Sequence, residues 1–164
     1  MKTDSVTLVY ELLKDAFGAT FTTYYNGDPE AIPSFNLPAL IIDQTGDDTI
    51  GGAFQEDDVT DHVVVKVVLD KRDDFDGDLV KPLNTTAKKI RDYIGKIDPK
   101  TGTYANGTVK YVIRHALFKG VTILANDMKV DYGIATRVAG EGLADLTAEG
   151  HVAFDITHIQ RTDI

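Results

Sequence analysis

The sequence contains no cysteine, and this absence removes several classes of function at once. A chain without cysteine has no disulfide framework, no thiol nucleophile and no thiolate ligand for a metal. Long apolar runs are also missing, because none approaches the roughly 18 residues that a membrane-spanning helix needs. The N-terminal segment carries Asp4 and Glu11 within its apolar stretch, which is untypical of a signal peptide. We therefore expect a soluble protein that is assembled inside a cell.

Familiar catalytic and nucleotide-binding motifs are absent too. The chain has no HExxH, GxSxG, Walker A or GxGxxG motif and no spaced set of zinc ligands. His62, His115, His151 and His158 fall in predicted strands or at their ends, and we expect His115 to be a hydrogen-bonded core residue. Asp155 lies near His151 and His158 in sequence, which leaves a hydrolytic cluster open, although no sharp Gly-Ser-Gly turn presents a nucleophile. We expect no enzymatic activity, no catalytic residue and no cofactor.

What the chain does have is a strong separation of charge along its length. The net charge is -9 in 164 residues. Residues 43–78 carry twelve acidic and three basic side chains, whereas residues 79–119 carry nine basic and two acidic ones. Such opposed blocks favour pairing within the chain or head-to-tail contact between copies. The acidic surplus disfavours non-specific binding to nucleic acid.

Hydrophobic periodicity predicts an α+β fold in a single domain, residues 1–164, with two main helices packed on a mostly antiparallel sheet. The first helix is expected to begin at Asp4 or Ser5 and to end before Gly18, and the second to span residues 78–96. The last strand alternates in HVAFDITHI. The expected strands are residues 21–25, 39–43, 59–69, 109–118, 121–127, 128–138 and 151–159.

The most unusual stretch is GDDTIGGAFQEDD, residues 46–58, within a hairpin loop of about 15 residues, a length that usually indicates function or mobility. Three interpretations remain open: a cation site, a mobile tip without a role, or an arm that becomes ordered against a partner. Ile50 and Phe54 favour the arm, because apolar side chains on an exposed tip need a surface to bury them. Its expected contact residues are Asp47, Asp48, Ile50, Gly51, Gly52, Phe54, Glu56, Asp57 and Asp58.

A second acidic run, DKRDDFDGD at residues 70–78, has the composition of a calcium loop but not its spacing. With Gly77 at the sixth position, Arg72 takes the first ligand position and Leu83 the twelfth, where an acid is required. Acidic residues before a helix are otherwise expected, because they cap its free N–H groups and oppose its dipole. We assign no metal ligand to this run and interpret it as a helix cap.

The second predicted helix presents a basic face. Its members are Lys81, Lys88, Lys89 and Arg91. This face is either simply solvated or a contact surface, for the acidic block or, less favoured, for phosphate.

In its layout the chain resembles the tail terminator family of long-tailed bacteriophages, the small proteins that cap the tail tube. A helix ending in DAFGATF precedes PALIIDQTGDDTIGGAFQEDDVTDHVVVKVVL, in which a buried strand, a polar hairpin and a long strand follow one another. A second helix comes next, and VDYGIATRVAGEGLADLTAEGHVAFDITHI closes the chain with a loop and an alternating strand. The resemblance covers nearly the whole chain and rests on this plan rather than on a diagnostic motif.

The resemblance implies a non-enzymatic virion protein that forms a ring, expected to be hexameric, at the end of the tail tube. Its partners would be further copies of itself, the tail tube protein and a head–tail connector or neck protein. Genomic DNA would pass through the lumen without specific binding, and assembly would take place in the host cytoplasm. The alternatives are another neck completion protein and, less favoured, a small cation-binding module that uses the acidic loop.

Overall fold

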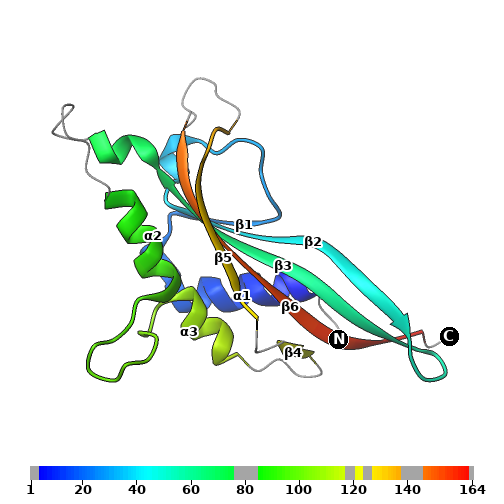
Figure 1. The fold of residues 1–164 in the computed structure, drawn as a ribbon. Coiled ribbons are helices and arrows are strands. Elements are labelled where there is room, and N and C mark those ends of the chain that lie inside the picture. Colours follow the sequence, from blue (N-terminus) through cyan, green and yellow to red (C-terminus); the bar gives the residue numbers. More distant parts are fainter. Residues whose placement is uncertain (1–3, 76–84, 117–120, 124–126, 138–145, 163–164) are drawn as a thin grey trace.

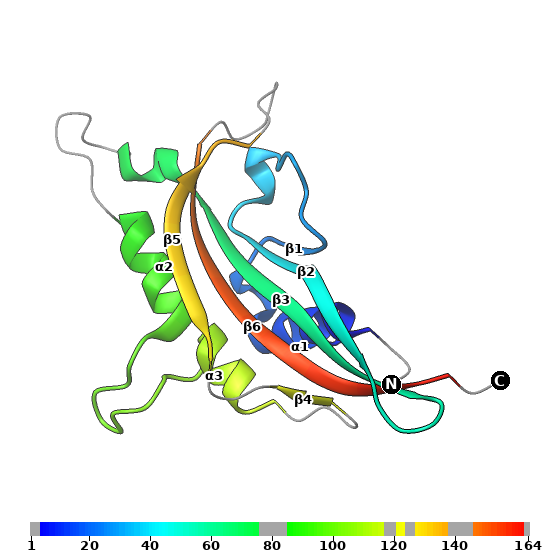
Figure 2. The same cartoon turned by 45° about the vertical axis from the view of Figure 1, so that its right-hand side comes forward.

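A twisted six-stranded sheet organises the chain, and helices cover one of its faces (Figures 1 and 2). The computed structural model describes residues 4–75, 85–116, 121–123, 127–137 and 146–162. The result is an α+β domain, as the sequence predicts. Its helices and strands are α1 (Ser5–Phe17), β1 (Thr23–Asn26), β2 (Ala39–Gly51), β3 (Glu56–Asp70), α2 (Thr85–Gly95), α3 (Val109–Arg114), β4 (Val121–Ile123), β5 (Lys129–Ala135) and β6 (Thr147–Arg161), with short 3-10 turns at Gly18–Thr20, Ser34–Asn36 and Lys71–Phe75.

The strand order is β1-β2-β3-β6-β4, and β5 also pairs with β6. Only β1 and β2 run parallel, and every other pair is antiparallel. β3 is central and pairs with β6 along its whole length, from Glu56 opposite Arg161 to Asp70 opposite Thr147. β5 and β4 follow each other along the outer side of β6, opposite residues 147–153 and 156–158.

The core lies between the sheet and the helices. Because strand side chains alternate between faces, Val63, Val65, Val67 and Leu69 of β3 all point toward the helices and are buried. This confirms the wholly apolar face that the sequence predicts for this strand. The other face of the sheet has only a small apolar cluster at one end, formed by Ile32, Ala39, Ile41 and Val68. Beyond that cluster the described part of the open face carries polar side chains such as Lys66, His151 and Asp155, together with Val64, Ile50 and Ile159.

The helix boundaries follow their capping residues. Asp4 accepts a hydrogen bond from the Thr7 backbone N–H at 2.8 Å, and α1 ends at Gly18, which has a positive φ of +53°. The buried Asp74 accepts from the backbone N–H and the hydroxyl of Thr86 and from the Thr85 hydroxyl, at the start of α2. This confirms a capping role for one acid of the 70–78 run. The expected first part of this helix, residues 78–84, lies outside the described residues.

One predicted strand is wrong. The segment expected as strand 109–118 forms α3 over Val109–Arg114, and residues 117 and 118 lie outside the described part. Thr108 caps this helix by accepting from the Tyr111 backbone N–H at 3.2 Å, and Val109, Val112 and Ile113 recur at helical spacing and are buried. The run of β-branched residues concealed that spacing.

The same correction applies to His115. It follows the last turn of α3, where its Nδ1 lies 2.9 Å from the Tyr111 carbonyl oxygen and its ring stacks on the Tyr111 ring. It is exposed and is therefore not a core histidine.

Gly150 in β6 marks the closest approach of α2 to the sheet. A Cβ at this position would lie 2.4 Å from Ile90 Cγ2 and 2.6 Å from Ile94 Cδ1. We predict that Gly150→Ala lowers the free energy of unfolding by about 1–3 kcal/mol through overpacking, as measured by urea denaturation. Gly133→Ala is the matched control, because no atom lies within 4 Å of its added methyl group. An unchanged stability in Gly150→Ala would contradict this packing.

Candidate functional site: the hairpin arm

The β2–β3 hairpin extends past the helices as a three-stranded projection, which we call the hairpin arm (Figures 1 and 2). It comprises residues 46–62 and the paired end of β6, residues 155–161. β2 stays paired with β3 as far as Gly51 opposite Asp57, and β6 stays paired with β3 as far as Arg161 opposite Glu56. The predicted loop length of about 15 residues is therefore wrong, because only residues 52–55 lie outside the two strands.

The tip of the arm is held by main-chain hydrogen bonds. The Gly52 N–H donates to the Glu56 carbonyl at 3.0 Å, the Glu56 N–H to Ala53 at 2.9 Å, and the Thr162 N–H to Gln55 at 2.8 Å. Gln55 takes a positive φ of +62° to complete the turn. The segment is thus already paired within the single chain, whereas we expected from the sequence that it takes its shape against a neighbour.

A bulge sets where the arm leaves the body of the sheet. The register between β2 and β3 shifts between Gln44 and Gly46. Before the shift Ile42 points toward the helices, opposite Val65, and after it Asp47 does, opposite Asp61. Bulges bend a strand and increase its twist. The shift therefore puts Asp48 and Ile50 on the open face and Asp47 on the helix side.

Apolar side chains are exposed on the arm. Phe54 at the tip is 90% exposed and Ile50 is 68% exposed, as their place in an exposed segment predicts. Ile50 lies opposite Asp58, which lies opposite Ile159 on β6, so Ile50 and Ile159 share the open face of the sheet. We call Ile50, Phe54 and Ile159 the tip patch. Ile159 was missed from the sequence because it sits in the polar half of an alternating strand.

Acidic side chains surround this patch. Asp58 lies between Ile50 and Ile159 on the same face, and Glu56 lies 3.4 Å from Arg161 Nε, whereas Asp47 and Asp57 are on the helix side of the arm. Among the described residues, Asp57 and Asp58 form no ion pair. The part of the chain that the structure describes also holds no group of three or more His, Asp or Glu side chains placed to bind a metal ion. The arrangement is an apolar patch with a negative border.

His62 links the three strands at the root of the arm. Its Nδ1 lies 2.6 Å from Asp155 Oδ1 on β6, and its Nε2 lies 2.8 Å from Asp48 Oδ2 on β2. Hydrogen bonds to Asp155 first and Asp48 second raise the pKa of His62 above its usual value. When it is protonated, the ring can donate to one carboxylate on each neighbouring strand.

The helix side of the same root is closed by a buried polar cluster around Asp61. Asp61 accepts from the Ser5 hydroxyl at 2.5 Å and from Gln44 Nε2 at 3.1 Å, and it lies 3.0 Å from His158 Nε2. Ser5 is the first residue of α1, so this cluster fixes the helix to the arm.

The hydrolytic cluster left open by the sequence does not form. His158 faces the helices, whereas His151 and Asp155 lie on the open face, because odd and even positions of β6 point to opposite sides. Asp155 is engaged with His62, and His151 lies 3.0 Å from Glu149.

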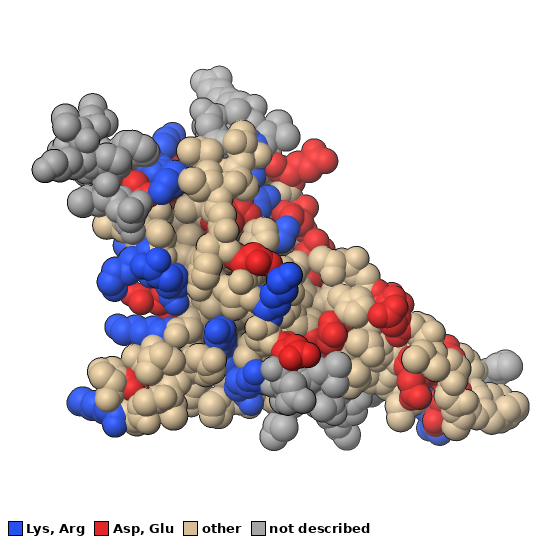
Figure 3. Space-filling view, in the orientation of Figure 1, with Lys and Arg blue, Asp and Glu red and all other residues tan. Residues whose placement is uncertain are grey.

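The basic face of α2 lies at the other end of the molecule from the arm (Figures 1 and 3). Lys88, Lys89 and Arg91 are exposed, and Lys88 donates to Asp92 at 2.8 Å. Lys81, the fourth expected member, lies outside the described residues. The acids of the arm and this basic face therefore do not meet within one chain.

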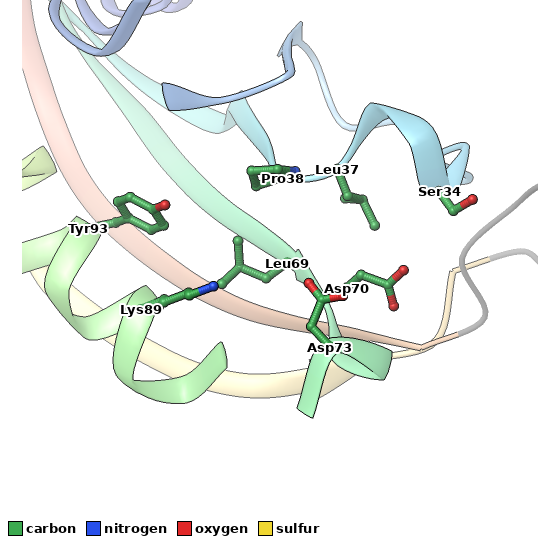
Figure 4. A pocket seen from close by; sticks show the side chains of 8 residues that line it. All are labelled: Ser34, Leu37, Pro38, Leu69, Asp70, Asp73, Lys89 and Tyr93. Carbon is green, nitrogen blue, oxygen red and sulfur yellow. The ribbon is translucent and has the colours of Figure 1, made fainter. Parts of the chain in front are cut away.

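Lys89 also lines a small pocket of about 160 Å³ between α2 and the end of β3 (Figure 4). Lys89 and Tyr93 face Asp70 and Asp73 across it, with Leu69 between them. Asp70 is bound by the Arg72 guanidinium. The pocket is lined by acidic and basic side chains of the same chain, so the surface beside α2 carries charges of both signs.

A charged network on the open face was not anticipated from the sequence. The buried Arg137 donates through Nε and Nη2 to Glu149 at 3.0 and 2.9 Å, and through Nη1 to Asp28 at 2.9 Å and the Pro29 carbonyl at 2.6 Å. Lys66 also binds Asp28. The network borders an open cleft of about 470 Å³. Since each Arg137 nitrogen already has a partner, the network joins the segment after β1 to β6.

Burial of Glu149 would by itself raise its pKa, but hydrogen bonds from His151 and Thr147 and the Arg137 guanidinium lower that pKa to about 2. No sequence signal marks this set, because Asp28 lies 109 positions away from Arg137 and Arg137 lies 12 positions away from Glu149.

The sequence matches no model of a protein family, and no significant similarity to a curated protein is found. None of the described helices is long and apolar enough to cross a membrane.

Removal of Arg137 tests the network. We predict that Arg137→Ala lowers the free energy of unfolding by about 3–5 kcal/mol, because Glu149 is left as an unpaired buried charge, as measured by urea denaturation at pH 7. The lowered pKa makes this contribution of Glu149 present above about pH 4.5 and lost as the pH falls toward 2. Arg161→Ala, an exposed arginine on the arm, is the control and should change stability by less than about 1 kcal/mol. Equal effects of the two substitutions would contradict the network's role.

The His62 bridge gives a second prediction. NMR titration should place the pKa of His62 above its usual value of 6.5. Asp155→Asn should lower that pKa more than Asp48→Asn, and Asp47→Asn, which removes no His62 contact, should leave it unchanged. Because the folded-state pKa is raised, the bridge stabilises the arm below about pH 6.5 and loses this effect as the pH rises past the folded-state value. An unaltered His62 pKa in Asp155→Asn would show that the bridge is not formed in solution.

Proposed function

We propose that the chain is a non-enzymatic virion protein of a long-tailed bacteriophage. In this proposal it forms a ring of six copies on the end of the tail tube, stops tube polymerisation and connects the tail to the neck of the head. The resemblance in layout to tail terminators motivates the family. The hairpin arm is the observation that carries the assembly role.

The arm has the properties of a contact element. It projects from the body, it is ordered by its own three-stranded ladder, and it exposes an apolar patch inside a negative border. A preorganised projection loses little conformational entropy when it binds. An exposed apolar tip on a long, otherwise polar hairpin needs a partner surface.

The charge distribution supports contact between copies of the chain. Negative charge gathers on the arm and positive charge over α2, at opposite ends of the molecule (Figure 3). A ring is built from heterologous contacts, in which one patch of each copy meets a different patch of the next. Opposite charges on the two patches steer such contacts and set their register.

The net charge of -9 also suits a channel for DNA. A ring with surplus acidic groups repels phosphate and does not hold the genome by a strong cationic contact. The proposed partners are thus other copies of the chain, the tail tube protein and the neck protein, with DNA passing through.

Oligomer mass tests the ring directly. Native mass spectrometry over a rising concentration series, with negative-stain images of the same samples, should show six-fold rings with a central hole. Added to growing tail tubes of the same phage, the protein should sit at one end and stop their elongation.

Charge reversal tests the contact between the copies. Lys88→Glu with Lys89→Glu should prevent ring formation, and Asp57→Lys with Asp58→Lys in the same chain should restore it, because the two patches then exchange signs. Lys88 and Lys89 on α2 and Asp57 and Asp58 on the arm are charged surface residues, so these substitutions should not disturb the fold. The circular dichroism spectrum should therefore stay unchanged. Rings that persist in both variants would remove the charge-pairing mechanism.

A further inference from the structure

A second exposed apolar patch lies on β5, far from the arm. Tyr132 is 55% exposed and Ile134 is 61% exposed. Both point to the helix side of the sheet, opposite Gly150 and Ala148 of β6. Tyr132 lies beside the glycine against which Ile90 and Ile94 of α2 pack. We call Tyr132 and Ile134 the edge patch.

The backbone next to this patch is also available. Among the described residues β5 pairs only with β6, so its outer edge presents unpaired N–H and C=O groups. An exposed edge strand with large apolar side chains is a place where another chain attaches.

The helix beside the edge patch exposes basic side chains, Lys88, Lys89 and Arg91. Residues 89 and 91 lie on opposite flanks of α2, because each helical residue advances by about 100°. Lys89 faces the pocket beside β3, so Arg91 lies on the flank toward β5. Within β5, Lys129 and Asp131 both lie on the open face, opposite Ala153 and His151, so neither borders the edge patch.

The tip patch and the edge patch are therefore complementary in two respects. Each has an apolar centre, and the first lies beside Asp58 and Glu56, whereas the second lies beside Arg91 of the basic helix α2. An apolar centre with a charged rim is the usual composition of a protein interface. Both views place the tip of the arm well beyond β5, so the two patches do not meet within one chain (Figures 1 and 2).

We propose that the tip patch of each copy docks on the edge patch of the next copy, with Phe54 against Tyr132 and Ile134. This inference rests on the proposed ring and identifies the receiving surface within it. Because the two patches differ, the contact repeats head to tail from copy to copy. The chain of copies closes into a ring when the rotation between neighbours is a whole fraction of a full turn.

Cysteine cross-linking tests this contact, since the chain has no cysteine of its own. Phe54→Cys and Ile134→Cys are prepared as separate variants, mixed as dilute chains, concentrated and treated with a short bismaleimide. We expect covalent dimers in the mixture and none when either variant is treated alone. Phe35→Cys is the matched control, because Phe35 is 74% exposed but belongs to neither patch. Its mixture with Phe54→Cys should yield no dimers.

The outcomes separate the two proposals. If native mass spectrometry shows rings but Phe54→Cys does not cross-link to Ile134→Cys, or cross-links equally to Phe35→Cys, the edge patch is not the docking surface. The proposed ring would then still stand. Dimers from Phe54→Cys alone would indicate a two-fold contact and overturn the docking surface as well. A chain that stays monomeric at every concentration would overturn both. Ile134→Asp should abolish the ring without lowering the melting temperature, because this side chain is exposed.

Discussion

The pairing of β3 with a strand on each side is the interaction on which the rest of the structure depends. β6 follows β3 from end to end, and β2 follows it nearly as far. One half of this three-stranded ladder is covered by helices and forms the core. The other half runs beyond them and forms the arm. Main-chain hydrogen bonds satisfy the backbone along both halves, so the arm keeps its shape without a core of its own.

Polar groups hold the junction between these halves on both faces of the sheet. On the helix side Asp61 joins Ser5, Gln44 and His158, which fixes α1 to the root of the arm. On the open side His62 joins Asp48 to Asp155. Groups of this kind contribute little net free energy when satisfied, but they cost much when one partner is lost. They specify where the arm leaves the body more than they stabilise the fold.

The arrangement of charge gives the molecule two unlike ends. Ion pairs within each block account for part of their charge, as in Lys88 with Asp92 and Lys71 with Asp74. Most of the arm's aspartates remain on the surface, and α2 lies too far away to neutralise them (Figure 3). Unlike ends of this kind suit head-to-tail contact between copies. The ring that we propose uses both ends, in keeping with the proposed role as a tail terminator.

The sequence by itself determined the α+β class, the first helix with its Asp4 cap, the apolar face of β3 and the exposure of Ile50 and Phe54. These features depend on local periodicity and capping, which are readable over a few residues. The tertiary structure alone decided that the acidic loop is a paired arm, that residues 109–114 are helical, and that Arg137 meets Glu149 and Asp28. Strand register, bulges and contacts across a hundred residues depend on how distant segments pack, and no short stretch of sequence encodes them.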